Sequence, residues 1–291
     1  MTKRPLESLS SLTRRSMLAT TAGAALSLKA LAKVHGVELG VCGKPADFSK
    51  AGEYGYDYFE PSAASVAAMS DADFNTFRDT VKASKTPCRS FNILFSRGQN
   101  IDGPNVNLDP IMKYLDTTFA RCKDCGAKVV VWGSSGSRNV PQGFSRDTAW
   151  DQIKTFLKPA GDIAKKHNIV IGIEFLRHQE SNIINTGAEA LKLLTEVNHP
   201  NVQMIVDYYH LATEKEDPDI IRKAKDHIVH MHFANPAGRR WPHSADEDPG
   251  YAGFFKAVKD INYQGGLSIE GNGTFEADGA ASMAFFKSEL A

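Results

Sequence analysis

The chain has 291 residues, of which 42% are hydrophobic and 23% are charged, and its formal net charge is zero. A chain of this length and hydrophobicity can bury one large core, so we expect a single globular domain after any leader segment. The neutral balance and the lack of a long basic run give no surplus of Lys and Arg for phosphate contacts, so nucleic acid is not an expected partner.

The N-terminal segment has the features of an export signal. Arg14 and Arg15 precede a short apolar run of small residues, which ends at 30–32 in the A-x-A form of a cleavage site. The arrangement resembles a twin-arginine signal, and the run is too short to anchor a membrane stably. We therefore predict a signal peptide over 1–32, a mature domain over 33–291, and a periplasmic or otherwise exported location. A free amphipathic helix is the alternative interpretation.

Strand-like and helix-like runs alternate along the rest of the chain. The strand-like runs are 36–42, 56–61, 88–95, 128–133, 169–176, 202–209, 228–234 and 265–271. Such alternation is typical of a parallel sheet, and this number of units predicts a (β/α)8 TIM barrel. An open doubly wound sheet is the main alternative, but it usually has a glycine-rich phosphate loop after its first strand. The sequence there, GVCGKPADF, is not such a loop.

Alternation within the runs predicts which side chains face the barrel axis. In the seventh run, Val229, Met231 and Phe233 share one face of the strand. His230 and His232 share the other face. We expect the apolar set to face the surrounding helices and the polar set to face the axis.

The four cysteines, Cys42, Cys88, Cys122 and Cys125, are too few for a disulfide framework in a chain of this size. The last two form a CxxC pair inside FARCKDCGAK, which we interpret as the end of a helix. A structural zinc site would need a second such pair, and the sequence has none. We therefore expect structural cysteines, although export permits a disulfide.

Four polar side chains hold equivalent positions at the C-terminal ends of the last four strand-like runs. They are Glu174 in IVIGIEFL, Asp207 in VQMIVDYYH, His232 in IVHMHFA and Glu270 in GLSIEGN. A parallel barrel places these ends at one rim, where active sites of this fold lie. Three carboxylates gathered there repel one another, and a divalent cation offsets much of the cost of burying them. We predict a site for one divalent metal ion, with Mn²⁺ expected first and Mg²⁺, Co²⁺ or Zn²⁺ as alternatives.

Further polar residues follow the same strand ends. Glu180 lies in the loop after the fifth run, and His210 ends the sequence DYYH after the sixth. Arg239 and Arg240 lie in the loop after the seventh run, where a planar guanidinium can hold a sugar oxygen or a carboxylate. The sequence does not choose between the two arginines. His230 is expected one layer deeper, as a core histidine or a support for a ligand.

Together these stretches resemble the sugar isomerase/epimerase superfamily, the xylose isomerase-like TIM barrels that include ketose 3-epimerases and hydroxypyruvate isomerases. The resemblance runs from about residue 36 to 275 and is carried by IEFL with Glu180 downstream, DYYH, HMHFA and SIEGN. It implies Glu174, Asp207, His232 and Glu270 as metal ligands, Glu174 and Glu270 as the catalytic acid/base pair, and Glu180, His210 and one of Arg239 and Arg240 near the substrate.

The activity implied by the resemblance is metal-dependent isomerisation or epimerisation of a sugar or keto-sugar, by proton transfer through an enediolate. The same kind of site supports elimination, so a lyase or dehydratase acting on a keto-inositol or a 3-keto-glycoside is the second hypothesis. A non-catalytic exported sugar-binding protein is the third. An abasic-site endonuclease shares the barrel type, but its multi-zinc site needs more histidines at the mouth. We also expect a small-molecule sugar partner, no stable membrane insertion, and allow for a homo-oligomer.

Two stretches depart from the pattern of the superfamily. Many relatives have a Pro-Leu-Asn type sequence after the glutamate of the fifth strand, where this chain has Phe175-Leu176-Arg177. The loop after the seventh strand, NPAGRRWPHSADEDPGY, is rich in charge. Both lie where substrate is expected, and an exported enzyme meets few sugar phosphates. We therefore expect a free sugar, a keto-sugar or an oxidised glycoside as substrate.

Overall fold

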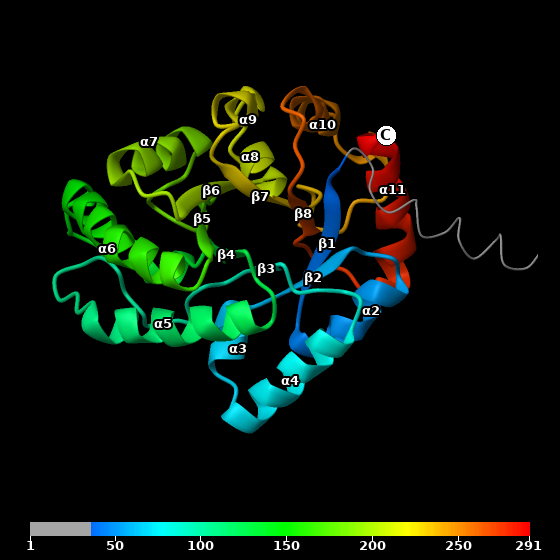
Figure 1. The fold of residues 1–291 in the computed structure, drawn as a ribbon. Helices are drawn as coiled ribbons and strands as arrows, with labels where there is room; N and C mark the ends of the chain where they lie inside the picture. The colour runs from blue at the N-terminus through cyan, green and yellow to red at the C-terminus, as the bar shows by residue number, and fades with distance from the viewer. Residues whose placement is uncertain (1–35) are drawn as a thin grey trace, which may run out of the picture. The chain divides into compact units, whose positions relative to one another are not determined.

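The structure, a computed structural model, describes residues 36–291, so the predicted export signal lies outside the described residues. Within this range, eight parallel strands are paired in the order β2-β1-β8-β7-β6-β5-β4-β3, and helices surround them (Figure 1). The strands are β1 Glu38–Gly43, β2 Tyr58–Pro61, β3 Ser90–Phe91, β4 Val129–Trp132, β5 Val170–Glu174, β6 Val202–Asp207, β7 Ile228–Phe233 and β8 Gly266–Ile269. The predicted (β/α)8 barrel is confirmed.

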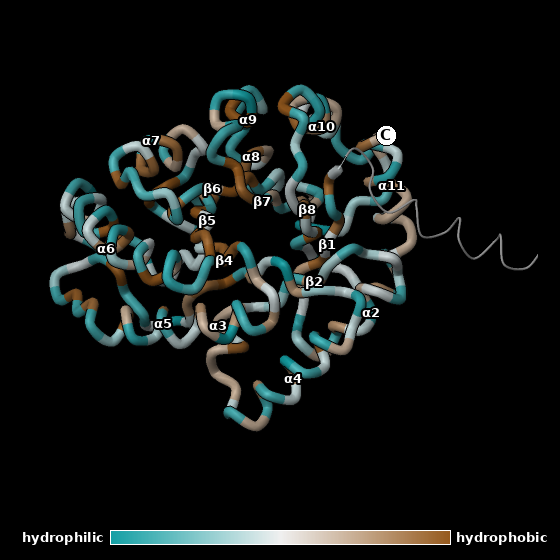
Figure 2. The backbone as a smooth tube through the Cα atoms, in the orientation of Figure 1, coloured by the Kyte–Doolittle hydropathy of each residue, from teal (hydrophilic) through white to brown (hydrophobic). Residues whose placement is uncertain are grey.

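The helices that surround the sheet contain both polar and apolar residues, whereas the strands are apolar along most of their length (Figure 2). The α-helices are α2 Phe48–Glu53, α3 Ala63–Ala67, α4 Asp71–Ala83, α5 Asp109–Asp124, α6 Arg146–Lys166, α7 Gly187–Val197, α8 Tyr208–Thr213, α9 Asp219–Lys223, α10 Tyr251–Asp260 and α11 Ala280–Leu290. In α6, the Ser145 side chain caps the first turn by accepting from the Thr148 N–H. Trp150, Ile153 and Leu157 then recur at helical spacing on its buried face.

The sheet closes between its two end strands, β2 and β3. Ser62 and Asn92 form an isolated parallel bridge next to these strands. The Asn92 N–H donates to the Pro61 carbonyl at 3.1 Å, and the Ala63 N–H donates to the Asn92 carbonyl at 2.8 Å. These bonds join the edges, so the main-chain groups at both edges are paired there.

The predicted strands are all present, but the last six end earlier than expected, and the structure explains two of these ends. The run 88–95 pairs regularly only at Ser90–Phe91, because Ile93 has a φ of 47° and turns the chain out of the extended conformation. The run 202–209 is a strand only as far as Asp207, whose side chain accepts from the Tyr209 N–H and caps α8.

One prediction of side-chain direction is wrong. Val229 was expected to face the helices with Met231 and Phe233, but it packs against an apolar cluster of Val129, Val131 and Ile205. The cluster lies inside the barrel, since a Cβ added at Gly172, on the same face of β5 as Glu174, would lie 2.6 Å from Ile205 Cγ2. The pairing of β6 with β7 shifts between Met204 and Ile205, and such a bulge places an additional residue on the inner face.

The cysteines match the structural interpretation. All four are free, and Cys88, Cys122 and Cys125 are buried. The CxxC pair lies at the end of α5, as the sequence predicts. Over residues 36–291, none of the helices has both the length and the apolar character that crossing a membrane requires.

Ile93 provides a test of backbone strain. A β-branched residue rarely adopts its positive φ, and 46% of its surface is exposed, so packing does not explain the conformation. Such a conformation costs on the order of 1–3 kcal/mol. We expect Ile93→Asn, which tolerates this region, to raise the free energy of unfolding by about 1 kcal/mol in urea denaturation. Ile93→Val, which keeps the branched side chain, should leave the stability unchanged, and a destabilised Asn variant would contradict the strain.

Candidate metal centre

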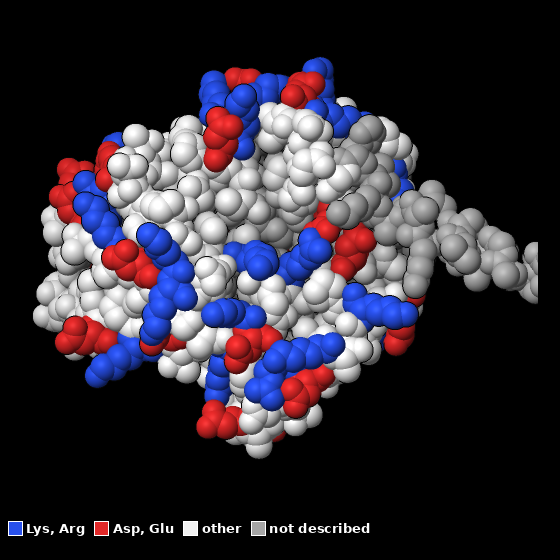
Figure 3. Space-filling model, in the orientation of Figure 1, with Lys and Arg blue, Asp and Glu red and all other residues white. Residues whose placement is uncertain are grey.

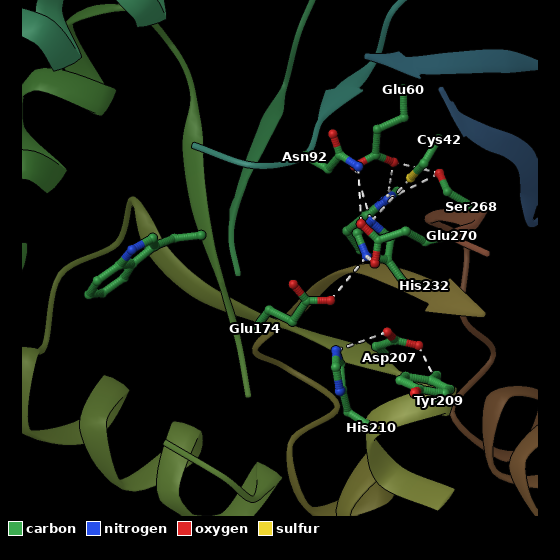
Figure 4. A network of polar contacts seen from close by, with 12 residues as sticks. Cys42, Glu60, Asn92, Glu174, Asp207, Tyr209, His210, His232, Ser268 and Glu270 are labelled. Atoms are coloured by element: carbon green, nitrogen blue, oxygen red, sulfur yellow. Dashed lines mark hydrogen bonds and ion pairs between the residues drawn. The ribbon is translucent and has the colours of Figure 1, made fainter. Parts of the chain in front are cut away.

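The four residues expected to bind a metal converge at the C-terminal rim of the barrel. Ligand atoms of Glu174, Asp207, His232 and Glu270 all lie within 4.8 Å of one another. Glu174 and Asp207 end β5 and β6, His232 is the penultimate residue of β7, and Glu270 directly follows β8. Figure 4 shows their side chains pointing toward a common centre.

The polar atoms of this cluster fit a divalent cation. His232 Nδ1 lies 3.1 Å from Glu174 Oε1 and 3.4 Å from Glu270 Oε2. Asp207 Oδ1 accepts from the Tyr209 N–H at 2.8 Å. Its Oδ2 is buried and has no hydrogen-bond partner within residues 36–291. This buried carboxylate oxygen accepts no hydrogen bond and lies next to two further carboxylates and an imidazole. A divalent metal ion bound to these four groups would satisfy it.

The two glutamates differ in their acidity. Burial raises the pKa of Glu174, and the charge of Glu270 raises it further. Burial also acts to raise the pKa of Glu270, but His232 and Arg239 favour its ionised form and hold its pKa at about 2. Burial raises the pKa of Asp207 to about 7. The surroundings therefore shift the pKa values of the two glutamates in opposite directions, and acid/base pairs in active sites show such a separation.

Of the two arginines left open by the sequence, Arg239 faces the cluster. Its Nη2 donates to Glu270 Oε2 at 2.7 Å and lies 3.7 Å from Asp207 Oδ2. Its Nη1 lies 3.5 Å from Glu180 Oε1. Arg240 is exposed instead, and its Nε donates to the Ala237 carbonyl. Arg240 is thus placed away from the carboxylates.

His210 and Glu180 lie at the same rim. The His210 ring is buried, and its Nδ1 accepts from the Arg177 N–H at 3.3 Å. Burial lowers the pKa of His210 to about 3, so the ring is neutral and its proton is on Nε2. Nε2 lies 3.4 Å from Asp207 Oδ2 and has no hydrogen-bond partner within the described residues. Glu180 Oε1 accepts from Arg177 Nε at 2.6 Å.

The sequence reasoning missed Glu60, the penultimate residue of β2. Glu60 Oε1 lies 3.1 Å from His232 Nε2, and its Oε2 lies 2.7 Å from His230 Nε2. Ser90 and Ser268 donate to the same Oε2. Although burial opposes ionisation, the two histidines hold the pKa of Glu60 well below its usual range. Glu60 therefore fixes the His232 ring with Nδ1 toward the metal ligands, and His230 lies in the supporting layer.

Two more residues at the rim were not selected from the sequence. Asn92 Nδ2 donates to Glu270 Oε1 at 3.0 Å. Cys42 Sγ lies 3.9 Å from His232 Nε2, and burial raises the pKa of this thiol. Glu60 and Cys42 follow the same rule as the selected residues, since each lies at the C-terminal end of a strand. Applying that rule to the first two strand-like runs would have found both.

Comparison with known proteins identifies relatives of this arrangement. Residues 48–289 match the family model described as "Xylose isomerase-like TIM barrel". The chain is 34% identical over 110 residues to L-ribulose 3-epimerase of Methylomonas sp. (strain DH-1), which covers 38% of this chain and 37% of that protein. It is 26% identical over 167 residues to 3-dehydro-D-guloside 4-epimerase of Escherichia coli (strain K12), covering 55% of this chain and 63% of that protein. The chain spans less than two thirds of the length of both relatives.

A solved structure shares the fold. The crystal structure of D-allulose 3-epimerase from Methylomonas sp. in complex with D-allulose superposes with a TM-score of 0.75 and 19% sequence identity. The match covers 87% of this chain and 97% of that chain. At this identity the similarity establishes the barrel architecture.

The support that Glu60 gives to His232 can be measured through metal affinity. After its metal has been removed with a chelator, we expect the protein to bind one Mn²⁺ per chain in calorimetric titration. Because partners that orient a ligand typically contribute about 10–100-fold to affinity, Glu60→Gln should weaken binding by that factor. The matched control is Glu196→Gln on α7, whose carboxylate accepts from Trp150 on the outer surface. Equal Mn²⁺ affinities for the two variants would contradict the supporting role of Glu60. If the unmodified protein bound no Mn²⁺, the metal centre itself would be contradicted.

Proposed function

The chain belongs to the xylose isomerase-like TIM barrel family, and we propose that it is a divalent-metal-dependent epimerase or isomerase of a keto-sugar. The observation that carries the proposal is the convergence of three carboxylates and one imidazole, with two glutamates of opposite acidity among them. The epimerases to which the chain is similar support the same reaction class. Mn²⁺ is the proposed ion, because oxygen donors with one imidazole suit it.

The residues of the site can perform the proton transfers of such a reaction. Glu174, Asp207, His232 and Glu270 would hold a divalent cation, which would supply polarisation of a substrate carbonyl and so acidify the neighbouring C–H group. Glu270, ionised at neutral pH, accepts that proton. Glu174, whose pKa is raised by burial and by the charge of Glu270, supplies a proton to the other face of the carbon. Transfer by two carboxylates inverts the carbon, whereas return by a single carboxylate to the adjacent carbon moves the carbonyl.

Arg239 and His210 are proposed to position the substrate. The Arg239 guanidinium is bonded to Glu270, and its charge also stabilises negative charge that develops on a nearby oxygen. Neutral His210 presents an N–H without a partner among the described residues, which suits a donor to a sugar oxygen. Both groups act without changing their own protonation.

Elimination is the second candidate reaction. Glu174, whose pKa is raised by burial, can also donate a proton to a leaving oxygen, which would make the protein a lyase or dehydratase acting on a keto-inositol or 3-keto-glycoside. The two reactions share the first proton abstraction and differ in what the enediolate loses or regains.

Turnover in heavy water separates these reactions. We expect the metal-loaded protein to incorporate deuterium into one of a panel of keto-sugars, with the mass otherwise retained and an epimer or isomer formed. Loss of water or of an aglycone would identify the lyase. Glu270→Gln should lower kcat by about 10²–10⁴-fold while retaining sugar binding. Glu276→Gln, an exposed glutamate that pairs with Lys50, is the control. If the protein bound sugars but incorporated no deuterium and eliminated no group under any condition, it would be a binding protein and not an enzyme.

We propose that residues 1–32 direct export, on the strength of the paired arginines and the A-x-A tripeptide in the sequence. Export of a folded, metal-loaded enzyme fits a substrate without phosphate. The mature chain recovered from the periplasm should begin at Lys33 by N-terminal sequencing. Recovery of an intact Met1 from the cytoplasm alone would contradict the proposal.

A further inference from the structure

Two pockets flank the candidate metal centre, and residues of only one of them take part in the reaction proposed above. The first, of about 490 Å³, is lined by Glu270, Arg239 and Asn92. The second, of about 500 Å³, lies between the loops after β3 and β4 and is called here the Ser/Gly pocket. It is lined by Ile93, Phe95, Ser96, Arg97, Gly133, Ser134, Ser135, Gly136 and Ser137. Each volume falls in the range of roughly 300–1,000 Å³ that small-molecule pockets occupy.

The Ser/Gly pocket is contiguous with the site through Gly133 and Ile93. A Cβ added at Gly133 would lie 1.7 Å from Glu174 Oε2, so the pocket begins directly at one of the two proposed acid/base residues. Ile93 lines both pockets and is the dividing wall between them. A molecule held over the metal ligands therefore has a cavity on the Glu270 side and a second cavity on the Glu174 side.

The walls of the Ser/Gly pocket suit a hydroxyl-rich, uncharged group. The Ser134 Oγ accepts from the Phe95 N–H at 3.0 Å, which leaves its own proton free to donate. The Ser135 hydroxyl has no hydrogen-bond partner among residues 36–291. Arg97 is exposed and likewise makes no ion pair within the described chain, so its donors are available for oxygen acceptors. Small polar side chains with available hydroxyl donors suit the hydroxyl groups of a sugar.

We propose that the Ser/Gly pocket binds the second unit of a glycoside, so that the substrate is a keto-glycoside or keto-disaccharide rather than a free ketose. The proposal rests on the keto-sugar epimerase function proposed above. The keto ring lies over the metal ligands, and the aglycone or second sugar extends past Ile93 into the Ser/Gly pocket. The exposed, strained Ile93 then acts as an apolar wall that directs the two units into their own cavities.

Gly136 allows the Ser/Gly pocket to be filled without disturbing the fold. It is exposed, a Cβ there would meet no heavy atom within 4 Å, and its φ lies outside the left-handed region. Gly136→Trp should therefore fold and occlude the pocket. The control is Gly253→Trp on α10, where an added Cβ meets only Pro218 Cγ at 3.6 Å and which lines neither pocket.

The probes are a 3-keto-glucoside with a glucosyl aglycone and D-psicose as a free ketose. We expect the unmodified protein to prefer the 3-keto-disaccharide by at least about tenfold in kcat/KM. Gly136→Trp should remove that preference and leave kcat/KM for D-psicose within about twofold, whereas Gly253→Trp should change neither. Equal kcat/KM values for both probes, with no effect of Gly136→Trp, would overturn the second subsite while the epimerase proposal stands.

A binding measurement separates this proposal from the proposed reaction. In a Glu270→Gln background, calorimetry should give at least about tenfold tighter binding of the 3-keto-disaccharide than of D-psicose, and the added Gly136→Trp should remove the difference. If that difference is found but no sugar is turned over by the unmodified protein, the subsite stands and the epimerase proposal fails. Equal binding of both probes would overturn the subsite whatever the turnover.

Discussion

The structure depends on one electrostatic constraint, the burial of three carboxylates around one imidazole at the end of a closed barrel. Without compensation these charges repel one another at short range in a medium of low dielectric. The chain compensates with the cation of Arg239 above the cluster, at 2.7 Å from Glu270, and with His232 within it. Burial still raises the pKa of Asp207 to about 7, so the protein alone does not satisfy all three carboxylates. A divalent cation held by these ligands would complete the charge balance, and this is the physical reason to regard the cluster as a candidate metal centre.

The same constraint explains the buried polar residues next to His232 inside the barrel. Glu60 is ionised and fully buried, and it receives hydrogen bonds from Ser90 and Ser268 as well as contacts from His230 and His232. On the other side, the buried guanidinium of Arg138 donates to the carbonyls of Trp132 and Glu174 and so holds the ends of β4 and β5. Burial lowers the pKa of Arg138 to about 10, and it remains charged near neutral pH. Buried residues therefore hold the candidate ligands and the ends of their strands in place, which keeps the cluster preorganised.

Much of this arrangement could be predicted from the sequence, because alternation and strand order are local properties. Glu174, Asp207, His232 and Glu270 were found from their equivalent positions at strand ends. The direction of Val229 was not found, because a bulge depends on the pairing of two strands. The early end of β3 depends on the positive φ of Ile93, which its residue type disfavours. The choice of Arg239 over Arg240 depends on the conformation of their loop, where Arg239 has a φ of 49° and its side chain contacts Glu270. Physical information of this kind is non-local, and residue type and spacing do not contain it.

The departure of this chain at Phe175-Leu176-Arg177 has a structural consequence at the site. Arg177 donates to Glu180 at 2.6 Å, and its guanidinium carbon lies 4.9 Å from the centre of the Tyr209 ring. The Arg239 guanidinium carbon lies 4.7 Å from the same ring. Tyr209 and Glu180 therefore organise two arginines side by side, and the carboxylate of Glu180 is occupied by cations instead of being open to a sugar hydroxyl. The family resemblance assigns a substrate contact to Glu180, but in this structure its Oε1 contacts Arg177 and Arg239. Through these contacts the departure after β5 is coupled to the charged loop after β7, which carries Arg239.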